Sequence, residues 1–230
     1  MRDFTNATAL TLDAYQHIAD LYAATHTRAN IPDFWRDRLK RLADVLRDSS
    51  GYQNNPTLPV LDIGCGPGRD SLLLAQMDFH VLAADISQAM LEQARQRCTG
   101  QPGAEHITFR RMDMHTLDLP TASCAGILAS ASFLHIPKNE NLGVLNEFQR
   151  VLVPGGALML LVKECDEKEA ERYETHPQTG HTRFFARYRG SELWDLLEQA
   201  SFDVLEMNAS IDGRFTNRQR WLAALATKVK

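Results

Sequence analysis

The sequence has no long apolar run and no excess of basic charge. No stretch of about 18 uncharged apolar residues occurs, so we expect no membrane-spanning helix. The first residues, MRDFTNATALTLDAY, lack the basic flank and apolar segment of a secretory signal. Lys and Arg number 25 against 29 Asp and Glu, a formal charge of −4, which argues against general nucleic-acid binding. We therefore expect a cytoplasmic protein with neither a nucleic-acid partner nor membrane contact.

Cysteines are few and widely separated in this sequence. None of the four belongs to a C-x-x-C pair, which argues against a zinc site and fits reduced thiols. Two histidines in a polar stretch, His176 and His181, have a spacing that fits no helical metal pair, and we expect them to be exposed. We predict that the protein holds no metal. The four cysteines are Cys65, Cys98, Cys124 and Cys165.

The amino-acid composition is typical of a globular domain. Of 230 residues, 44% are hydrophobic and 23% are charged. Residues 48–59 are rich in turn formers, and the apolar spacing before them is helical. We predict one domain over 1–230, composed of a helical extension over 1–48 and an α/β core over 58–230.

Beyond residue 59, short apolar runs alternate with amphipathic segments. This alternation predicts a parallel sheet with helices on both faces. A last helix over 191–200 precedes two apolar runs, 202–210 and 221–229, which we expect to form an antiparallel hairpin at the sheet edge. The other expected strands are 59–63, 80–84, 107–110, 126–130 and 157–162, and the expected helices between them are 69–77, 87–98 and 138–152.

The segment VLDIGCGPG, residues 60–68, carries the most information about chemistry. An apolar strand runs directly into glycines at alternate positions, which let the backbone turn sharply and approach a ligand. A helix expected from Arg69 would point its N–H groups at the same space. We therefore expect a ligand at the carboxyl end of this strand, where open α/β sheets bind ligands.

The next strand ends at Asp85, about 20 residues after the glycine loop. A carboxylate there can accept hydrogen bonds from both hydroxyls of a ribose. The G-x-G-x-G spacing differs from the G-x-G-x-x-G of dinucleotide sites, which argues against an NAD(P)-linked oxidoreductase. The nearby carboxylates of Asp62 and Asp70 disfavour phosphate and suit a ligand with positive charges. The sequence thus predicts an adenosine-type nucleoside site.

These motifs resemble the class I S-adenosylmethionine-dependent methyltransferase family. The resemblance rests on VLDIGCGPG, the acidic strand end in VLAADIS, RMDMH at 111–115, and RVLVPGGA at 150–157, in that order. It implies a Rossmann-like α/β fold with a seven-stranded, mostly parallel sheet, an antiparallel edge hairpin and an N-terminal helical lid. It also implies S-adenosylmethionine as the cofactor.

The resemblance also implies residue roles. Asp85 would hold the ribose, Met112 and Asp113 would meet the adenine, and Tyr22 on the first helix would reach the cofactor carboxylate. The residues expected to bind the cofactor are Asp62, Gly64, Cys65, Gly66, Gly68, Asp85, Ile86, Met112, Asp113, Ser130 and Tyr22.

The methyl acceptor is expected beyond the fourth strand, at residues 130–137. The polar-proline-aromatic tetrapeptide of many amino N-methyltransferases is absent there, which favours a small-molecule O, N or S acceptor. His135 is the candidate general base, because histidine titrates near neutrality, and a purely structural role is the alternative. His17, on the first helix, could also face the pocket. The residues expected near the acceptor are Tyr15, Phe133, Arg183 and Tyr188, with a half-buried edge strand as the alternative for the last two.

The predicted function is transfer of a methyl group from S-adenosylmethionine to a small molecule. Two alternatives stay open at this point. One is a tRNA-modifying methyltransferase, and the other is a protein that binds S-adenosylmethionine without catalysis. The sequence is compatible with either a monomer or a homodimer.

Overall fold

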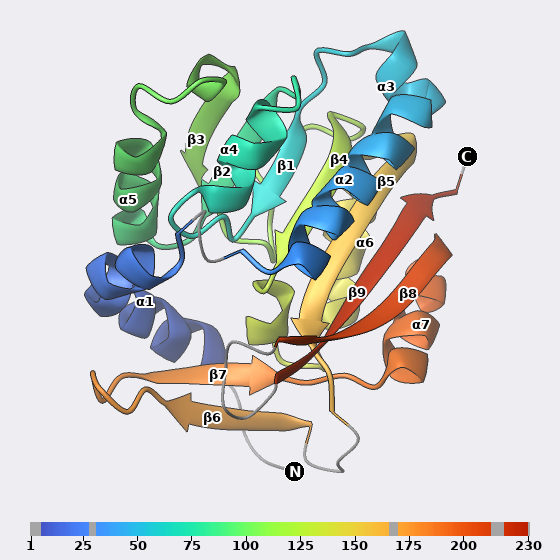
Figure 1. Ribbon diagram of the computed structural model, residues 1–230. Coiled ribbons are helices and arrows are strands. Elements are labelled where there is room, and N and C mark those ends of the chain that lie inside the picture. The colour runs from blue at the N-terminus through green and yellow to red at the C-terminus, as the bar shows by residue number, and fades with distance from the viewer. Residues whose placement is uncertain (1–5, 28–30, 166–169, 213–218, 230) are drawn as a thin grey trace.

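The computed structural model describes residues 6–27, 31–165, 170–212 and 219–229 (Figure 1). Helices come first in the chain, as the spacing predicts. A short third helix was not predicted, because it lies in a segment rich in turn formers. The Ser49 hydroxyl starts this helix by accepting a hydrogen bond from the Tyr52 N–H. The three helices are α1 (Ala7–Thr25), α2 (Asp33–Asp48) and α3 (Ser50–Asn54).

A seven-stranded sheet forms the centre of the molecule, in the order β3-β2-β1-β4-β5-β9-β8. β1 to β5 are parallel to one another, whereas β9 is antiparallel to β5 and to the edge strand β8. This confirms the predicted mostly parallel sheet with an antiparallel hairpin at its edge. The strands are β1 (Val60–Ile63), β2 (Val81–Asp85), β3 (Ile107–Arg111), β4 (Cys124–Ser130), β5 (Leu152–Lys163), β8 (Phe202–Asp212) and β9 (Gln219–Lys228).

Helices cover both faces of the sheet. Figure 1 shows α2 and α4 in front of the sheet and α6 behind it. Every residue of β1 and β2 is buried, which explains why these strands read as continuous apolar runs. The helices of the core are α4 (Arg69–Ala75), α5 (Gln88–Cys98), α6 (Asn141–Val151) and α7 (Gly190–Gln199), with short 3₁₀ turns η2 (Ala104–His106) and η3 (Phe133–His135).

A second, two-stranded sheet consists of β6 (Glu171–Thr175) and β7 (Thr182–Ala186). This hairpin was not predicted, because its first strand lies next to the polar stretch that contains His176 and His181. β7 buries the three consecutive residues Phe184, Phe185 and Ala186, whereas no residue of β6 is buried. Figure 1 shows the hairpin below the carboxyl edge of the main sheet, beside α1. Residues 166–169, which precede β6, lie outside the described residues.

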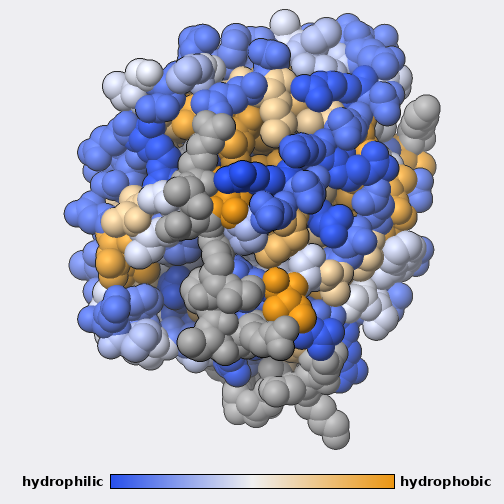
Figure 2. Space-filling model, viewed as in Figure 1, coloured by the Kyte–Doolittle hydropathy of each residue, from blue (hydrophilic) through white to orange (hydrophobic). Residues whose placement is uncertain are grey.

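The visible surface is mostly hydrophilic, with small separate hydrophobic areas (Figure 2). The large exposed hydrophobic side chains come from different elements, for example Leu10 on α1, Trp194 on α7 and Ile211 on β8. Within the described ranges, no helix combines the length and apolar character needed to cross a bilayer. A cavity lies at the carboxyl edge of the main sheet.

Candidate functional site

The cavity lies where β1, β2 and β4 end, and α1 forms its outer wall. Thr8, Thr11 and Leu12 of α1 line it on one side, and Ser132 of the β4 exit lines it on the other. The structure brings many of the predicted site residues to this one space. They are Tyr15, Tyr22, Gly64, Cys65, Gly66, Asp85, Ile86, Met112, Asp113, Ser130 and His135.

The glycine loop is held close to the end of β4. Gly64 has φ +72°, and a Cβ placed on it would lie 2.3 Å from the Cβ of Ser132. The Ser132 hydroxyl in turn donates to the Ile63 carbonyl at 2.7 Å. Glycine is therefore required at position 64 both by the backbone angle and by the approach of the neighbouring strand.

Asp85 is buried at the end of β2 and holds the glycine loop through its carboxylate. One oxygen accepts the Gly66 N–H at 2.9 Å, and the other accepts the Ser87 N–H at 2.8 Å. Burial raises the pKa of Asp85 to about 6, against the effect of these two donors. A carboxylate has about four acceptor sites, so about two stay open toward the cavity.

Asp113 reaches the cavity beyond β3 and is oriented by His115. One Asp113 oxygen accepts from both the backbone N–H and Nδ1 of His115, at 3.0 and 2.7 Å. The opposite ring nitrogen of His115 lies 2.8 Å from the Glu140 carboxylate. The hydrogen bond to Asp113 is the largest cause of the raised pKa of His115. The second oxygen of Asp113 makes no contact with His115 and is available to a ligand.

Asp70 joins three elements at the cavity wall, a role that the sequence analysis did not assign. Its carboxylate accepts from the Trp35 indole at 3.0 Å and the Ser130 hydroxyl at 2.8 Å. Arg69 donates to it at 2.7 Å, and its guanidinium lies 4.8 Å from the centre of the Trp35 ring. Burial opposes ionisation of Asp70, but the Arg69 charge overcomes it and lowers the pKa. The only sequence signal was an Arg-Asp pair at a helix start.

Two residues expected at the cofactor do not line the cavity. Asp62 is 1% exposed and accepts a hydrogen bond from Ser71 on α4, so it holds the helix under the loop. Burial raises its pKa to about 7. Gly68 starts α4, and a Cβ there would lie 2.9 Å from the Cβ of Ala94, so this glycine serves the packing of α4 on α5.

His135 lies against the cavity with both ring nitrogens engaged. Nδ1 is 2.6 Å from the Phe184 carbonyl oxygen, which can only accept, so Nδ1 carries the proton. Burial lowers the pKa of His135 to about 3, so the ring is neutral near pH 7. Nε2 therefore accepts the Tyr15 hydroxyl proton at 2.9 Å. The expectation of a histidine that titrates near neutrality is wrong, because the ring is buried.

Arg183 stands behind Tyr15 and is not among the residues that line the cavity. Its guanidinium donates to the Tyr15 hydroxyl at 3.2 Å and lies 5.3 Å from the centre of that ring. Its effect on a ligand would pass through Tyr15. The Tyr15 oxygen thus accepts a hydrogen bond from Arg183 of β7, and the Tyr15 hydroxyl donates one to His135.

Phe133 and Tyr188 were expected near the acceptor, but they belong to the core. Both are 0% exposed, and their rings stack at 6.1 Å. The Tyr188 hydroxyl accepts from Asn141 on α6, away from the cavity. Phe133 follows the β4 exit but turns inward on η3, where it meets Phe148.

Tyr22, His26 and Trp221 complete the wall. The Tyr22 ring stacks on His26 at 3.7 Å and meets Tyr15 edge-on at 5.5 Å. Trp221 of β9 is 8% exposed and lines the cavity, and its indole N–H has no hydrogen-bond partner among the described residues. Sequence patterns gave no sign of Trp221 at the site, because its position depends on the pairing of β9 with the distant strand β5.

The family model for a methyltransferase domain matches residues 60–156, from the start of β1 into β5. Among curated relatives, methyltransferase GfsG of Streptomyces halstedii is 34% identical over 53% of this chain and 41% of its own length. The 27-O-demethylrifamycin SV methyltransferase of Amycolatopsis mediterranei is 33% identical over 44% of this chain and 37% of its own length. The matched segment thus spans less than half of these relatives.

Solved structures share the fold over nearly the whole chain. The 1,6-didemethyltoxoflavin-N1-methyltransferase of Burkholderia thailandensis superposes with a TM-score of 0.70 at 20% identity, over 100% of this chain and 92% of its own. The [4+2]-cyclase SpnF reaches a TM-score of 0.69 at 16% identity, over 94% and 95%. Residues 60–156 are thus similar in sequence to methyltransferase domains, and the whole chain shares the fold of these solved structures.

Proposed function

We propose that the protein binds S-adenosylmethionine and transfers its methyl group to a small molecule. The observation that carries the proposal is Asp85. Its carboxylate is fixed by two backbone N–H groups and keeps about two acceptor sites open to the cavity, which matches the paired hydroxyls of a ribose. The residues around it fit the rest of that cofactor.

The adenine end of the cofactor fits the region between β2 and β3. Ile86 and Met112 line the cavity there and offer apolar surface to the faces of a purine. The open oxygen of Asp113 can accept the adenine amino group, while His115 and Glu140 hold the carboxylate in place. These contacts would select adenine over a base that presents a carbonyl at that position.

The methionine end fits the wall around Arg69, Asp70 and Ser130. Arg69 offers positive charge to a carboxylate, and Asp70 offers negative charge to an ammonium, although each already partly neutralises the other. The cofactor supplies a sulfonium-bound methyl group, which needs only alignment with the acceptor and exclusion of water. Closing the cavity with α1 excludes water, and we assign α1 the role of a lid.

The acceptor would lie between Tyr15, His135 and Trp221. Trp221 lines the cavity with its ring, and its indole nitrogen is buried, so it offers apolar surface to the acceptor. The Tyr15 oxygen can accept a hydrogen bond from an acceptor hydroxyl and orient it toward the methyl group, while His135 Nε2 holds the Tyr15 proton in place; the proton released on methylation passes to water. His135 therefore acts behind Tyr15 rather than on the acceptor itself.

Several relatives support a small-molecule acceptor. The proteins named above include a rifamycin methyltransferase and a methyltransferase solved with 1,6-didemethyltoxoflavin and S-adenosylhomocysteine. The net charge of −4 gives no support to a tRNA substrate.

The proposal is tested by incubating the protein with S-adenosylmethionine and a panel of hydroxylated and amino-bearing small molecules. Formation of S-adenosylhomocysteine and a product heavier by one methylene, both detected by mass spectrometry, is the expected result. At a cofactor concentration below saturation, an Asp85→Ala variant should give both signals more slowly than the wild type. If the wild type binds the cofactor but methylates no member of a broad panel, methyl transfer is refuted in favour of cofactor binding alone.

A different activity on this fold is a second candidate, because SpnF is named as a cyclase and superposes closely. The two candidates share the cavity but differ in the fate of the methyl group. A reaction in which the acceptor changes while S-adenosylmethionine stays intact would favour the second.

A further inference from the structure

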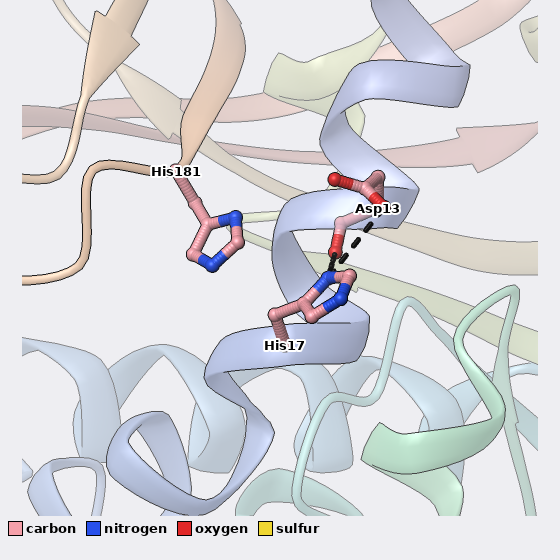
Figure 3. A group of neighbouring side chains, drawn as sticks. All are labelled: Asp13, His17 and His181. Carbon is pink, nitrogen blue, oxygen red and sulfur yellow. Dashed lines mark hydrogen bonds and ion pairs between the residues drawn. The ribbon is translucent and has the colours of Figure 1, made fainter.

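Three side chains outside the cavity come together at the seam between α1 and the β6–β7 hairpin. Asp13 and His17 are one turn apart on α1, and His181 lies in the turn that precedes β7. Their potential ligand atoms, two imidazole nitrogens and a carboxylate oxygen, all lie within 4.8 Å of one another. Figure 3 shows His181 facing the same side of α1 that carries Asp13 and His17.

The hydrogen bonding of His17 leaves one ring nitrogen for coordination. His17 Nδ1 is 2.8 Å from the Asp13 backbone carbonyl oxygen, as the dashed line in Figure 3 marks, so Nδ1 carries the proton. The lone pair is then on Nε2. This arrangement, in which the second nitrogen donates to a carbonyl, is the one that orients most metal-binding histidines.

The two histidines lie parallel and in contact. Their rings stack at 4.8 Å with an angle of 14° between planes. In a tetrahedral site with ligand distances of about 2.0–2.2 Å, ligand atoms lie about 3.4 Å apart. The lone pairs of stacked rings lie in nearly parallel planes, so one ring must turn before both nitrogens can reach a single ion. His17 and Asp13 are more than half exposed, which leaves their side chains free to rotate.

We propose that Asp13, His17 and His181 bind a divalent transition-metal ion of the zinc type. Two neutral imidazoles and one carboxylate favour zinc over calcium or magnesium, which prefer oxygen ligands. Water would fill the fourth position. The expectation of no metal site considered spacing along one helix, and it could not detect ligands that come from two elements.

The proposed metal site lies between α1 and the β6–β7 hairpin, so a bound ion would connect these two elements. α1 presents Tyr15 and Tyr22 to the cavity, and β7 presents the Phe184 carbonyl to His135. A metal on the outer side would tie these two elements together across the seam. Bound zinc should therefore hold α1 against the hairpin and raise the melting temperature of the protein.

The test is a calorimetric titration of the purified protein with zinc chloride alone, at neutral pH and without cofactor or acceptor. One zinc ion per chain should bind. His17→Ala and His181→Ala should each weaken binding by more than about tenfold, since even an outer-shell partner of a metal ligand contributes that much. Both variants should also lose the zinc-dependent rise in melting temperature.

A matched control is the His80→Ala variant. His80 forms another histidine pair with His106, at 5.3 Å between ring centres, but on a different part of the chain. This variant should bind zinc as the wild type does. Absence of zinc binding in the wild type, or unchanged binding in both His17→Ala and His181→Ala, would overturn the proposal. Neither outcome depends on methyl transfer.

Discussion

The two ends of the cavity are built in different ways. The cofactor end, from Gly64 to Asp85 and Asp113, comes from strand ends that follow one another along the chain. The acceptor end joins Tyr15 of α1, His135 of η3 and the Phe184 carbonyl of β7, which are far apart in sequence. The first end is determined by backbone geometry, and the second by contacts among side chains from distant segments.

The largest expected effect concerns the backbone of the cofactor end. Gly64→Ala should destabilise the protein by about 2–5 kcal/mol, because the new Cβ meets Ser132 and the φ angle disfavours alanine. Urea unfolding measures the change. Gly143→Ala, in an exposed and open position on α6, is the control and should stabilise by up to about 1 kcal/mol. Equal effects of the two substitutions would show that the loop is not constrained as described.

Asp85→Ala should weaken S-adenosylhomocysteine binding by about 1–3 kcal/mol, roughly five- to hundredfold, because a hydroxyl pair loses its acceptor. Isothermal titration calorimetry measures the affinity. Asp44→Ala removes the same charge from an exposed position on α2 and should leave it unchanged. An unaltered affinity in Asp85→Ala would remove this residue from the site.

At the acceptor end, the buried His135 should make the free energy of unfolding depend on pH. The pKa of His135 is about 3 in the folded protein, against about 6.5 when unfolded, so its contribution is present above pH 6.5 and is lost as the pH falls. Arg183 and Lys163 nearby add to the lowering. His135→Gln, which cannot titrate, should flatten the stability profile between about pH 6.5 and 3. Parallel profiles for variant and wild type would contradict the buried neutral ring.

The smallest expected effect is that of His115→Gln. Loss of the charged partner should loosen Asp113 and lower the S-adenosylhomocysteine affinity by a few-fold, about 0.5–1 kcal/mol. Because the pKa of His115 is raised, the wild type should also lose this affinity as the pH rises through that pKa. Titrations at two pH values test both statements. If the S-adenosylhomocysteine affinity of the wild type does not change with pH, His115 does not contribute to cofactor binding.

The difference between the cofactor end and the acceptor end also explains which features could be predicted from the sequence. The parallel sheet follows from the apolar alternation, the cavity position follows from the glycines after β1, and Asp85 follows from its place at a strand end. Asp62 lies only two residues from Gly64, yet its side chain points under the loop, a direction that the motif does not encode.

The remaining errors concern contacts between distant segments. Phe133 and Tyr188 were expected near the acceptor, but they pack on each other in the core. The hydrogen bond from Trp35 to Asp70 and the position of Trp221 depend on tertiary packing, and no local pattern indicates either.

The central claim is that the space beyond β1 and β2 accommodates S-adenosylmethionine. Calorimetric titration of the wild-type protein with S-adenosylhomocysteine, the product of methyl transfer, tests it most directly. We predict saturable binding of one molecule per chain, accompanied by a higher melting temperature. The absence of both heat and thermal stabilisation, with this compound and with S-adenosylmethionine, would contradict the claim.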